Sequence, residues 1–253
     1  MIHLVTFSDD KRKQSAQVCK ESALQNGVDK VEVYDPGAWD GSWDWCDTFQ
    51  WLNEETLKNS RGSGYWLWKP WIIANHIFMM ELKDGDFLIY SDAGVKWIAN
   101  VNEIISRMDE SVFLFSNGHQ HVHWCKADIM HGILGKQIDD SYTQVQASVI
   151  FFKVNDFTRK FIKEWLLFCQ MPGWIDDSIS FLPSHPEFAE NRHDQAILST
   201  LAYKYKIKQH WWPDQLWYES QRYRWPQDTY PSMLIHHRKR DKGKGEGKNP
   251  EWE

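Results

Sequence analysis

Short apolar runs alternate with amphipathic stretches along the chain. Residues 2–7 form an apolar, β-rich run, and Asp9 or Asp10 then begins a helix that Asn26-Gly27 ends near Gln25. The clearest helix follows Asn155, because four aromatic residues recur at spacings of three and four: Phe157, Phe161, Trp165 and Phe168. Similar patterns predict strands at 31–34, 87–90, 112–115, 147–154, 207 and 233–237, and helices at 48–58, 70–82, 101–108, 126–134 and 194–204.

This alternation of strands and helices predicts an α/β fold. Strands joined by helices form a mostly parallel central sheet with helices on both faces. Ligands of such sheets bind beyond the carboxyl ends of the strands. We therefore expect the functional residues among the polar side chains that follow apolar strands.

The chain of 253 residues has room for one large domain or two small ones. We expect a single domain over residues 1–237 and a charged, glycine-rich, flexible tail over 238–253. No apolar stretch approaches the ~20 residues that a membrane-spanning helix needs, and the acidic N-terminal segment is unlike a signal peptide. We expect no membrane span.

Charge and composition narrow the function further. The formal charge of −6 argues against a general nucleic-acid binder. The four cysteines are widely spaced, which is typical of reduced thiols and predicts a cytoplasmic protein. Sixteen tryptophans exceed what a core of this size requires. Flat rings suit sugar faces, nucleobases and protein partners, so we expect some of them to contact a ligand.

Asp92 is the sharpest candidate for a functional residue. It follows the apolar strand at 87–90 and is succeeded by Ala93-Gly94. A carboxylate at this edge of a sheet can hold a hard divalent cation, which in turn holds phosphate oxygens. A plain turn after a strand would have the same pattern, and the spacing alone does not separate the two interpretations.

Asp194 is the second candidate, within Arg192-His193-Asp194-Gln195. It begins a predicted helix after a long polar loop. Aspartate is a good N-cap residue, and a carboxylate beside a histidine is also a good general base. The two roles are compatible.

Two histidine-rich segments are candidates for metal binding. His236 and His237 end the last predicted strand and precede Arg238, which predicts a metal-binding imidazole beside cations for a diphosphate, or else a solvated basic tail. His119, His121, His123 and Cys125 alternate along the chain like zinc ligands. Same-face residues of a strand lie ~7 Å apart, so the second segment fits a polar loop beside a substrate groove better than a metal site.

Taken together, five motifs resemble GT-A-fold nucleotide-sugar glycosyltransferases, in particular the group found in bacterial polysaccharide loci and in large algal (chlorella) virus genomes. The resemblance spans about residues 1–237, and the order of the motifs is specific. They read Gly62-Ser63-Gly64-Tyr65-Trp66-Leu67-Trp68-Lys69-Pro70, Ser91-Asp92-Ala93-Gly94, Trp124-Cys125-Lys126-Ala127-Asp128, Gln146-Ala147-Ser148 and Arg192-His193-Asp194-Gln195.

The resemblance implies roles for individual residues. Asp92 matches the first carboxylate of the DxD metal motif, whereas Gly94 stands at the second position and His236 matches a late-strand metal ligand. Both would hold Mn²⁺ or Mg²⁺. The donor nucleotide would contact Thr6, Ser8, Lys69, Asp92, Ala93 and Arg238. Sugar and acceptor would contact Trp66, Trp124, Lys126, Asp128, Gln146 and His193.

The resemblance also implies the reaction. A sugar moves from a nucleoside-diphosphate donor, UDP-linked, to a hydroxyl of a glycan acceptor, in polysaccharide biosynthesis or protein glycosylation. Asp194 would be the base of an inverting transfer or the carboxylate that stabilises the cationic sugar of a retaining one. The protein would act in the cytoplasm, that of the host for a viral protein.

Two other classes of function compete with this interpretation. A carbohydrate-binding protein or lectin would explain the tryptophans but has no need of the strand-end aspartate. A metal-dependent phosphohydrolase would use Asp92, but it needs more acidic ligands than the Asp84 and Asp86 that precede the strand. The motifs GxxxxGK[ST], GxGxxG and GxSxG do not occur, which excludes the common NTPase, dinucleotide and hydrolase sites.

Overall fold

The computed structural model describes residues 1–35, 56, 58–80, 82–215 and 219–237, which form two compact units. Unit 1 combines Met1–Trp43, Phe87–Asp109 and Trp211–Glu253, and unit 2 combines Asp44–Asp86 and Glu110–His210. Both contain strands and helices, so the predicted α/β class is confirmed. The single domain predicted over 1–237 stays a prediction.

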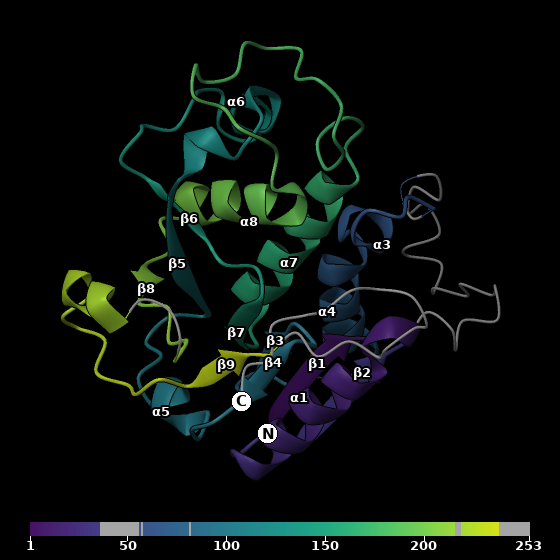
Figure 1. Cartoon of the computed structure of the whole chain (residues 1–253), viewed down its shortest axis with the longest axis vertical. Coiled ribbons are helices and arrows are strands. Elements are labelled where there is room, and N and C mark those ends of the chain that lie inside the picture. The colour runs from purple at the N-terminus through teal and green to yellow at the C-terminus, as the bar shows by residue number, and fades with distance from the viewer. Residues whose placement is uncertain (36–55, 57, 81, 216–218, 238–253) are drawn as a thin grey trace, which may run out of the picture. The chain divides into compact units, whose positions relative to one another are not determined.

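Unit 1 is built around strand β1 (Ile2–Phe7). It lies between β2 (Lys30–Tyr34) and β3 (Phe87–Ser91), and both pairs are parallel (Figure 1). A central parallel strand is covered on both faces, which explains why β1 is apolar almost throughout. Helix α1 (Lys13–Gln25) packs against this layer after a short 3₁₀ turn, η1 (Asp10–Arg12).

A second, antiparallel pair belongs to the same unit. Strand β4 (Val95–Trp97) pairs with β9 (Leu234–His236), and Val95 lies opposite His236. The short helix α5 (Asn102–Ile105) and the 3₁₀ helix η4 (Glu219–Arg224) complete the described elements of this unit. The pairing of β4 with β9 brings the last strand beside the segment that follows β3.

Unit 2 has β5 (Val112–Gln120) as its central strand. It runs parallel to β8 (Gln209–His210) and antiparallel to β7 (Val149–Lys153) and β6 (Thr143–Val145). With the separate pair of β4 and β9 left aside, three of the strand pairs described above are parallel and two are antiparallel, in line with the mostly parallel sheet predicted. The antiparallel pairs of β5 are an addition that the sequence pattern does not indicate.

The helices of unit 2 enclose its core. The longer ones described are α4 (Trp68–Met79), α6 (Ala127–Leu134), α7 (Asp156–Cys169) and α8 (His193–Lys204), and the short α3 (Gly62–Tyr65) precedes α4. Helix α7 packs on α4 and α8, and α8 packs on α6 and β6 (Figure 1). The side chain of Asn155 caps α7 by accepting the amide proton of Thr158 at 2.9 Å. Among the described residues, every helix is too short or too polar to cross a bilayer.

Some element boundaries differ from the prediction. Strand β5 continues to Gln120 instead of ending near Phe115, because its far end pairs with Thr143 of β6. The strand expected at Ile207 lies at Gln209–His210, and helix α5 covers only Asn102–Ile105 of the expected 101–108. Most of the helix expected at 48–58 and the whole tail 238–253 lie outside the described residues.

Candidate functional site

In unit 1, Asp92 directly follows β3, at the edge where the parallel strands β1 and β3 end. Its side chain is half-buried, and the hydroxyl of Tyr90 donates a hydrogen bond to Oδ1 of the carboxylate. The neighbouring Ala93 is buried. The predicted position of Asp92 at the carboxyl end of a buried strand is therefore what the structure shows.

His236 lies next to the segment that follows Asp92. The register of β4 and β9 sets it opposite Val95, and the amide of His237 donates to the carbonyl of Gly94 at 2.9 Å. Nδ1 of His236 contacts a carboxylate oxygen of the buried Asp214. With Nδ1 engaged in this way, Nε2 is the nitrogen with which His236 can bind a cation.

Two of the predicted donor contacts, Thr6 and Ser8, offer little surface. Thr6, within the buried strand β1, is 0% exposed, and Ser8, directly after the strand, is 2% exposed. The amide of Ser8 donates to the carbonyl of Tyr34 at 2.9 Å. Arg238 lies outside the described residues. The roles of these residues toward a nucleotide stay predictions.

In unit 2, Lys69 and Asp194 form a buried ion pair. Nζ of Lys69 lies 3.2 Å from Oδ2 of Asp194, and it donates to the carbonyl of Ala147 at 3.0 Å. Both residues are 4% exposed. Lys69 lies in the first turn of helix α4, and its ammonium contacts Asp194 instead of lying open to a ligand.

Asp194 does not cap its helix. Helix α8 begins at His193 with Arg192 at the N-cap position, so Asp194 lies in the first turn. The capping interpretation is therefore wrong, whereas a carboxylate in the first turn still benefits from the helix dipole. The alternative role in catalysis stays a prediction.

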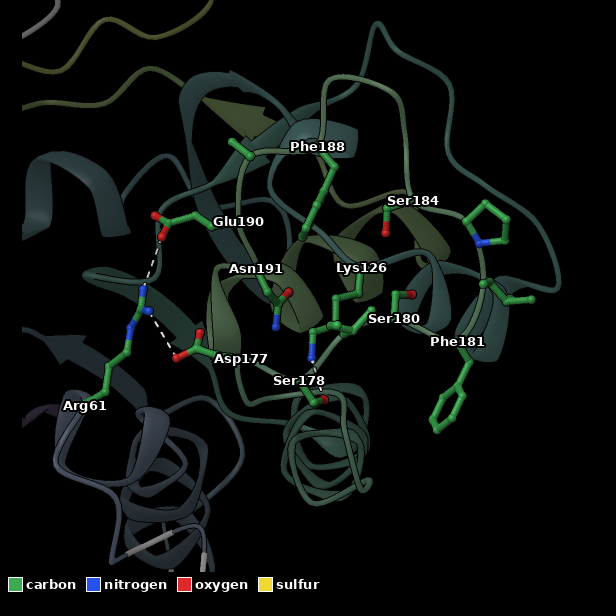
Figure 2. A pocket seen from close by; sticks show the side chains of 14 residues that line it. Arg61, Lys126, Asp177, Ser178, Ser180, Phe181, Ser184, Phe188, Glu190 and Asn191 are labelled. Carbon is green, nitrogen blue, oxygen red and sulfur yellow. Dashed lines mark hydrogen bonds and ion pairs between the residues drawn. The ribbon is translucent and has the colours of Figure 1, made fainter.

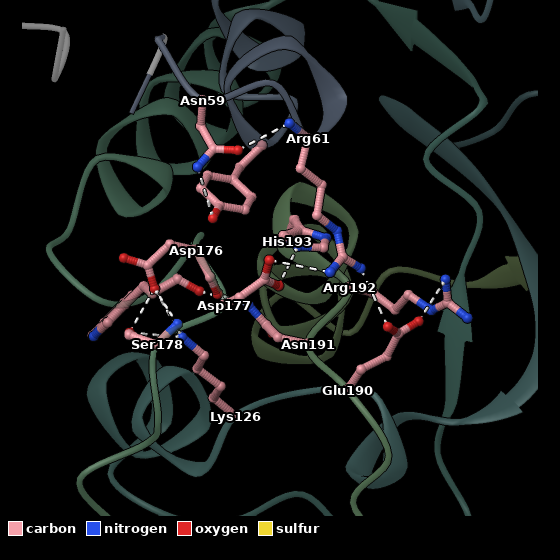
Figure 3. A network of polar contacts seen from close by, with 12 residues as sticks. Asn59, Arg61, Lys126, Asp176, Asp177, Ser178, Glu190, Asn191, Arg192 and His193 are labelled. Atoms are coloured by element: carbon pink, nitrogen blue, oxygen red, sulfur yellow. Dashed lines mark hydrogen bonds and ion pairs between the residues drawn. The ribbon is translucent and has the colours of Figure 1, made fainter. Parts of the chain in front are cut away.

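His193 connects α8 with the loop that precedes it. Its φ of 50° is left-handed, and its Nε2 lies 3.0 Å from Oδ1 of Asp177 (Figure 3). Arg61 also contacts Asp177, at 3.1 Å, and Glu190, at 3.2 Å. Burial lowers the pKa of His193, although the hydrogen bond and the charge of Asp177 act in the opposite direction.

Residues 62–66 form a left-handed turn. All five have positive φ: 59° at Gly62, 52° at Ser63, 96° at Gly64, 52° at Tyr65 and 61° at Trp66. Left-handed backbone costs about 1–2 kcal/mol for each residue other than glycine. Backbone strain of this kind persists where the surrounding structure holds it, and it concentrates at functional sites.

The rings of this turn pack on His193. The centroid of Tyr65 lies 5.4 Å from that of His193 with the rings stacked, and the centroid of Trp66 lies 5.1 Å away. The Trp66 indole also covers Gly62, where a Cβ atom would lie 2.4 Å from two of its ring carbons. The predicted sugar contacts Trp66 and His193 are thus brought together in unit 2.

Trp124 and Gln146 lie elsewhere in the unit. The Arg192 guanidinium lies 4.4 Å from the centroid of the Trp124 ring, a cation–π contact, and the Arg192 amide donates to the Trp124 carbonyl at 3.1 Å. Gln146 is half-buried, and its amide donates to the carbonyl of Phe115 at 2.7 Å. Trp124 therefore contacts Arg192, the residue that precedes α8 and that belongs to another of the five motifs.

Lys126 and Asp128 hold the loop between α7 and α8. The buried ammonium of Lys126 donates to the carbonyl of Gly173 at 2.6 Å and contacts Asp176 at 3.1 Å. The carboxylate of Asp128 accepts the amide protons of Phe181 at 2.7 Å and Leu182 at 2.8 Å. In this structure both predicted sugar contacts therefore anchor protein backbone.

A pocket of about 670 Å³ lies within this loop region of unit 2 (Figure 2). Polar and apolar groups share its lining, among them Arg61, Lys126, Asp177, Phe181, Phe188 and Asn191. Figure 2 shows Arg61, Asp177 and Glu190 on one side of it and Phe181 on the other.

Sequence reasoning missed Arg61, Asp177 and Asp214, because their partners are distant along the chain and no local motif marks them.

The histidine-rich segment does not gather into one site. Nε2 of His121 contacts Thr200 Oγ1 at 3.0 Å, and Cys125 is buried beside the same hydroxyl. Burial lowers the pKa of His121 to about 3 and raises that of Cys125 to about 12. His119 packs by the Trp124 ring, whereas His123 faces Glu187.

Comparisons with known proteins agree with this fold. No family model and no curated protein match the sequence. Among solved structures, the apo form of the WbbM bifunctional glycosyltransferase matches 94% of this chain with a TM-score of 0.52 and 12% identity. The chain covers 46% of WbbM, so it spans less than half of that protein.

Two further structures are also glycosyltransferases. Mouse xyloside xylosyltransferase 1 matches at 10% identity and a TM-score of 0.47, over 94% of this chain and 98% of its own. A glycosyltransferase involved in glycosylation of the PBCV-1 major capsid protein matches at 12% identity and a TM-score of 0.47, over 93% and 91%. On the likeness to WbbM, the GT-A-type glycosyltransferase fold that the motifs predict is confirmed.

Proposed function

We propose that the chain is a glycosyltransferase that moves a sugar from a nucleoside-diphosphate donor, UDP-linked, to a hydroxyl of a glycan acceptor. The observation that carries the proposal is the placement of Asp92 and His236 on adjoining segments at the end of β3. The fold shared with WbbM supports the same class of reaction.

The residues at the end of β3 suit a divalent cation. They offer one half-buried carboxylate and one imidazole, and Asp214 holds the imidazole by its other nitrogen. A carboxylate behind a metal-binding histidine fixes the ring and its tautomer. A bound Mn²⁺ or Mg²⁺ would neutralise charge on the departing diphosphate.

In unit 2, we propose Asp194 as the carboxylate of the chemical step. Lys69 keeps it ionised, because a buried carboxylate beside an ammonium is favoured in its charged form. An ionised carboxylate can take the proton of an attacking hydroxyl in an inverting transfer, or stabilise the cationic sugar of a retaining one. Lys69 is then a positioning residue.

The acceptor side of the proposal uses the same unit. Trp66, Trp124, Gln146 and His193 are proposed to contact sugar, and Lys126 lines the pocket in which the acceptor would lie. Half-buried aromatic rings with polar neighbours suit the two faces of a sugar. Asp128 supports this surface indirectly, because its carboxylate holds the backbone amides of Phe181 and Leu182.

The proposal places the protein in the cytoplasm. The three described cysteines, Cys19, Cys125 and Cys169, are free and buried, and burial raises the pKa of each thiol. Buried thiols of this kind are inert and compatible with a reducing compartment. Polysaccharide biosynthesis or protein glycosylation would then use donors made in the same compartment.

A lectin is the weaker alternative. Sugar binding alone does not require a buried ion pair at the start of a helix. It also does not require an aspartate and a histidine at the end of one strand. The fold shared with WbbM also favours a transferase over a lectin.

The test combines donor turnover with nucleotide binding. We expect one or a few members of a panel of nucleotide sugars to release nucleoside diphosphate, and calorimetry to show tighter UDP binding with Mn²⁺ than with a chelator. Asp92→Asn should remove the effect of Mn²⁺, and Asp109→Asn, at an exposed position of unit 1, should not. Equal UDP affinity with and without Mn²⁺ would contradict the cation, and intact donors throughout would contradict the transferase.

A further inference from the structure

Three metal-ligand side chains converge in unit 2 at a place that the proposed function does not use. They are His123 in the 3₁₀ turn η3 (His121–His123), and His185 and Glu187 in the loop between α7 and α8. One ligand atom of each lies within 4.8 Å of the other two. Nε2 of His123 is 3.0 Å from Oε2 of Glu187, and the two imidazole centroids are 5.1 Å apart.

The surroundings of His185 determine which of its nitrogens can bind a metal. Nδ1 of His185 accepts the amide proton of Glu187 at 3.1 Å, so in the neutral ring Nδ1 carries the lone pair and Nε2 carries the proton. A neutral imidazole binds metal through the nitrogen that carries no proton, so a cation would take the place of the Glu187 amide at Nδ1. Nε2 of His185 lies 3.6 Å from the carboxylate of Asp140, which adds a second negative charge to the cluster.

The cluster is both held in place and accessible. The side chains of His123 and His185 are 19% and 16% exposed, whereas that of Glu187 is 73% exposed. A cation can therefore enter from the side of Glu187 and meet two imidazoles of restricted mobility. Ligands of a tetrahedral zinc ion lie roughly 3.3 Å apart, so small side-chain rotations suffice to close the site.

We propose that His123, His185 and Glu187 form a zinc site. Two imidazoles and one carboxylate are a ligand set that Zn²⁺ favours and that Mg²⁺ or Ca²⁺ does not. The site is separate from the cation site proposed at Asp92 and His236, and it does not rest on the proposed function.

The position of the site indicates what the metal does. Ser184, Phe188 and Ala189 line the pocket, and the two loop ligands lie between Ser184 and Phe188 (Figure 2). The amide of Ala189 already donates to the carbonyl of His123 at 2.8 Å. Zinc adds a side-chain connection beside this backbone bond, and so fixes one wall of the pocket to η3.

The first test measures Zn²⁺ binding to the full chain in competition with a chromophoric chelator. We expect one tight equivalent with a Kd of about 1 μM or below, and a loss of about 10–100-fold in His185→Gln and in Glu187→Gln. Glu187 is exposed, so its variant folds even where the histidine variant does not. His131→Gln, an exposed histidine of α6, is the matched control and should bind as the wild type does.

A variant of the other proposed site identifies which residues hold the metal. Asp92→Asn should still bind one equivalent of Zn²⁺ tightly. If Asp92→Asn loses this equivalent while Glu187→Gln keeps it, the proposal is overturned. Absence of tight Zn²⁺ binding by the wild type would overturn it as well.

The second test follows the loop by hydrogen exchange. Zn²⁺ should slow amide exchange over residues 184–189 in the wild type and leave it unchanged in Glu187→Gln. Equal slowing in both proteins would contradict coordination by Glu187.

Discussion

The ammonium of Lys69 lies 3.2 Å from the carboxylate of Asp194, and the two side chains are 4% and 6% exposed. They come from the first turns of α4 and α8, so the pair joins two helices of unit 2 that are distant in sequence. Removing one partner of such a pair leaves the other charge buried without compensation, which is costly even where the intact pair adds little stability.

We therefore expect Asp194→Asn to lower the free energy of unfolding by about 3–5 kcal/mol, measured in urea. An N-cap carboxylate would give a much smaller loss, since asparagine caps nearly as well as aspartate. A stability change below about 1 kcal/mol would contradict the importance of the ion pair.

The double variant Lys69→Met, Asp194→Asn separates stability from catalysis. Neither remaining side chain is charged, so we expect this protein to recover much of the stability that Asp194→Asn loses. If Asp194 acts in the chemical step, turnover should stay reduced by about 10²–10⁴-fold in the double variant. Recovered turnover alongside recovered stability would show that the carboxylate serves the fold alone.

Gly62→Ala tests the left-handed turn. A left-handed conformation costs a residue other than glycine about 1–2 kcal/mol. We expect the free energy of unfolding to fall by more than this, because the new methyl group displaces the Trp66 indole. Gly85→Ala is the control: its φ of 91° is also left-handed, but no atom lies within 4 Å of the added Cβ. Urea denaturation measures both variants, and equal losses would show that the contact with Trp66 is unimportant.

The buried His121 predicts sensitivity to acid. Burial lowers its pKa to about 3, whereas the unfolded chain takes up the proton near pH 6.5. Between these values the unfolded state binds more protons, so stability falls as the pH falls through that range. From pH 7 to pH 5 the loss from this residue alone is about 2 kcal/mol.

Urea denaturation at both pH values checks this contribution. His121→Gln should reduce the difference between pH 7 and pH 5, whereas His131→Gln, at an exposed position, should leave it as in the wild type. An unchanged difference in His121→Gln would assign the acid sensitivity to other groups, His193 first, since its pKa is also lowered by burial.

Asp214→Asn tests the support of His236. The variant keeps a hydrogen-bonding side chain at this buried position but removes its charge. We expect the affinity for UDP in the presence of Mn²⁺ to fall by about 10-fold or more, with little change in the presence of chelator. A fall of equal size under both conditions would point to the fold instead of the cation.

Much of the local structure of this fold can be predicted from the sequence. The burial of β1, β3 and β7 and the aromatic face of α7 appear directly as apolar runs and spacings. These signals are local, because the hydrophobic period of a strand or a helix can be recognised within a few consecutive residues. The capping of α7 by Asn155 is equally local, because the cap residue directly precedes the helix.

The site residues that were missed depend on distant partners. Asp177 becomes important only because the chain brings Arg61 and His193 to it (Figure 3). The loop at 171–192 carries no periodic pattern, so sequence reasoning could not place Asp177, His185 or Glu187. The glycines at 62 and 64 signal an unusual backbone, but the left-handed φ of Tyr65 and Trp66 has no such signal.

Asp128 holds the backbone of the loop between α7 and α8, whereas some side chains of this loop are exposed. The amides of Phe181 and Leu182 are held by one carboxylate, while the side chains of Ile179 and Phe181 are 91% and 95% exposed. Substitutions at positions 179 and 181 thus change what the pocket rim presents without changing where the rim lies. Such a loop can diversify in recognition while its framework stays the same.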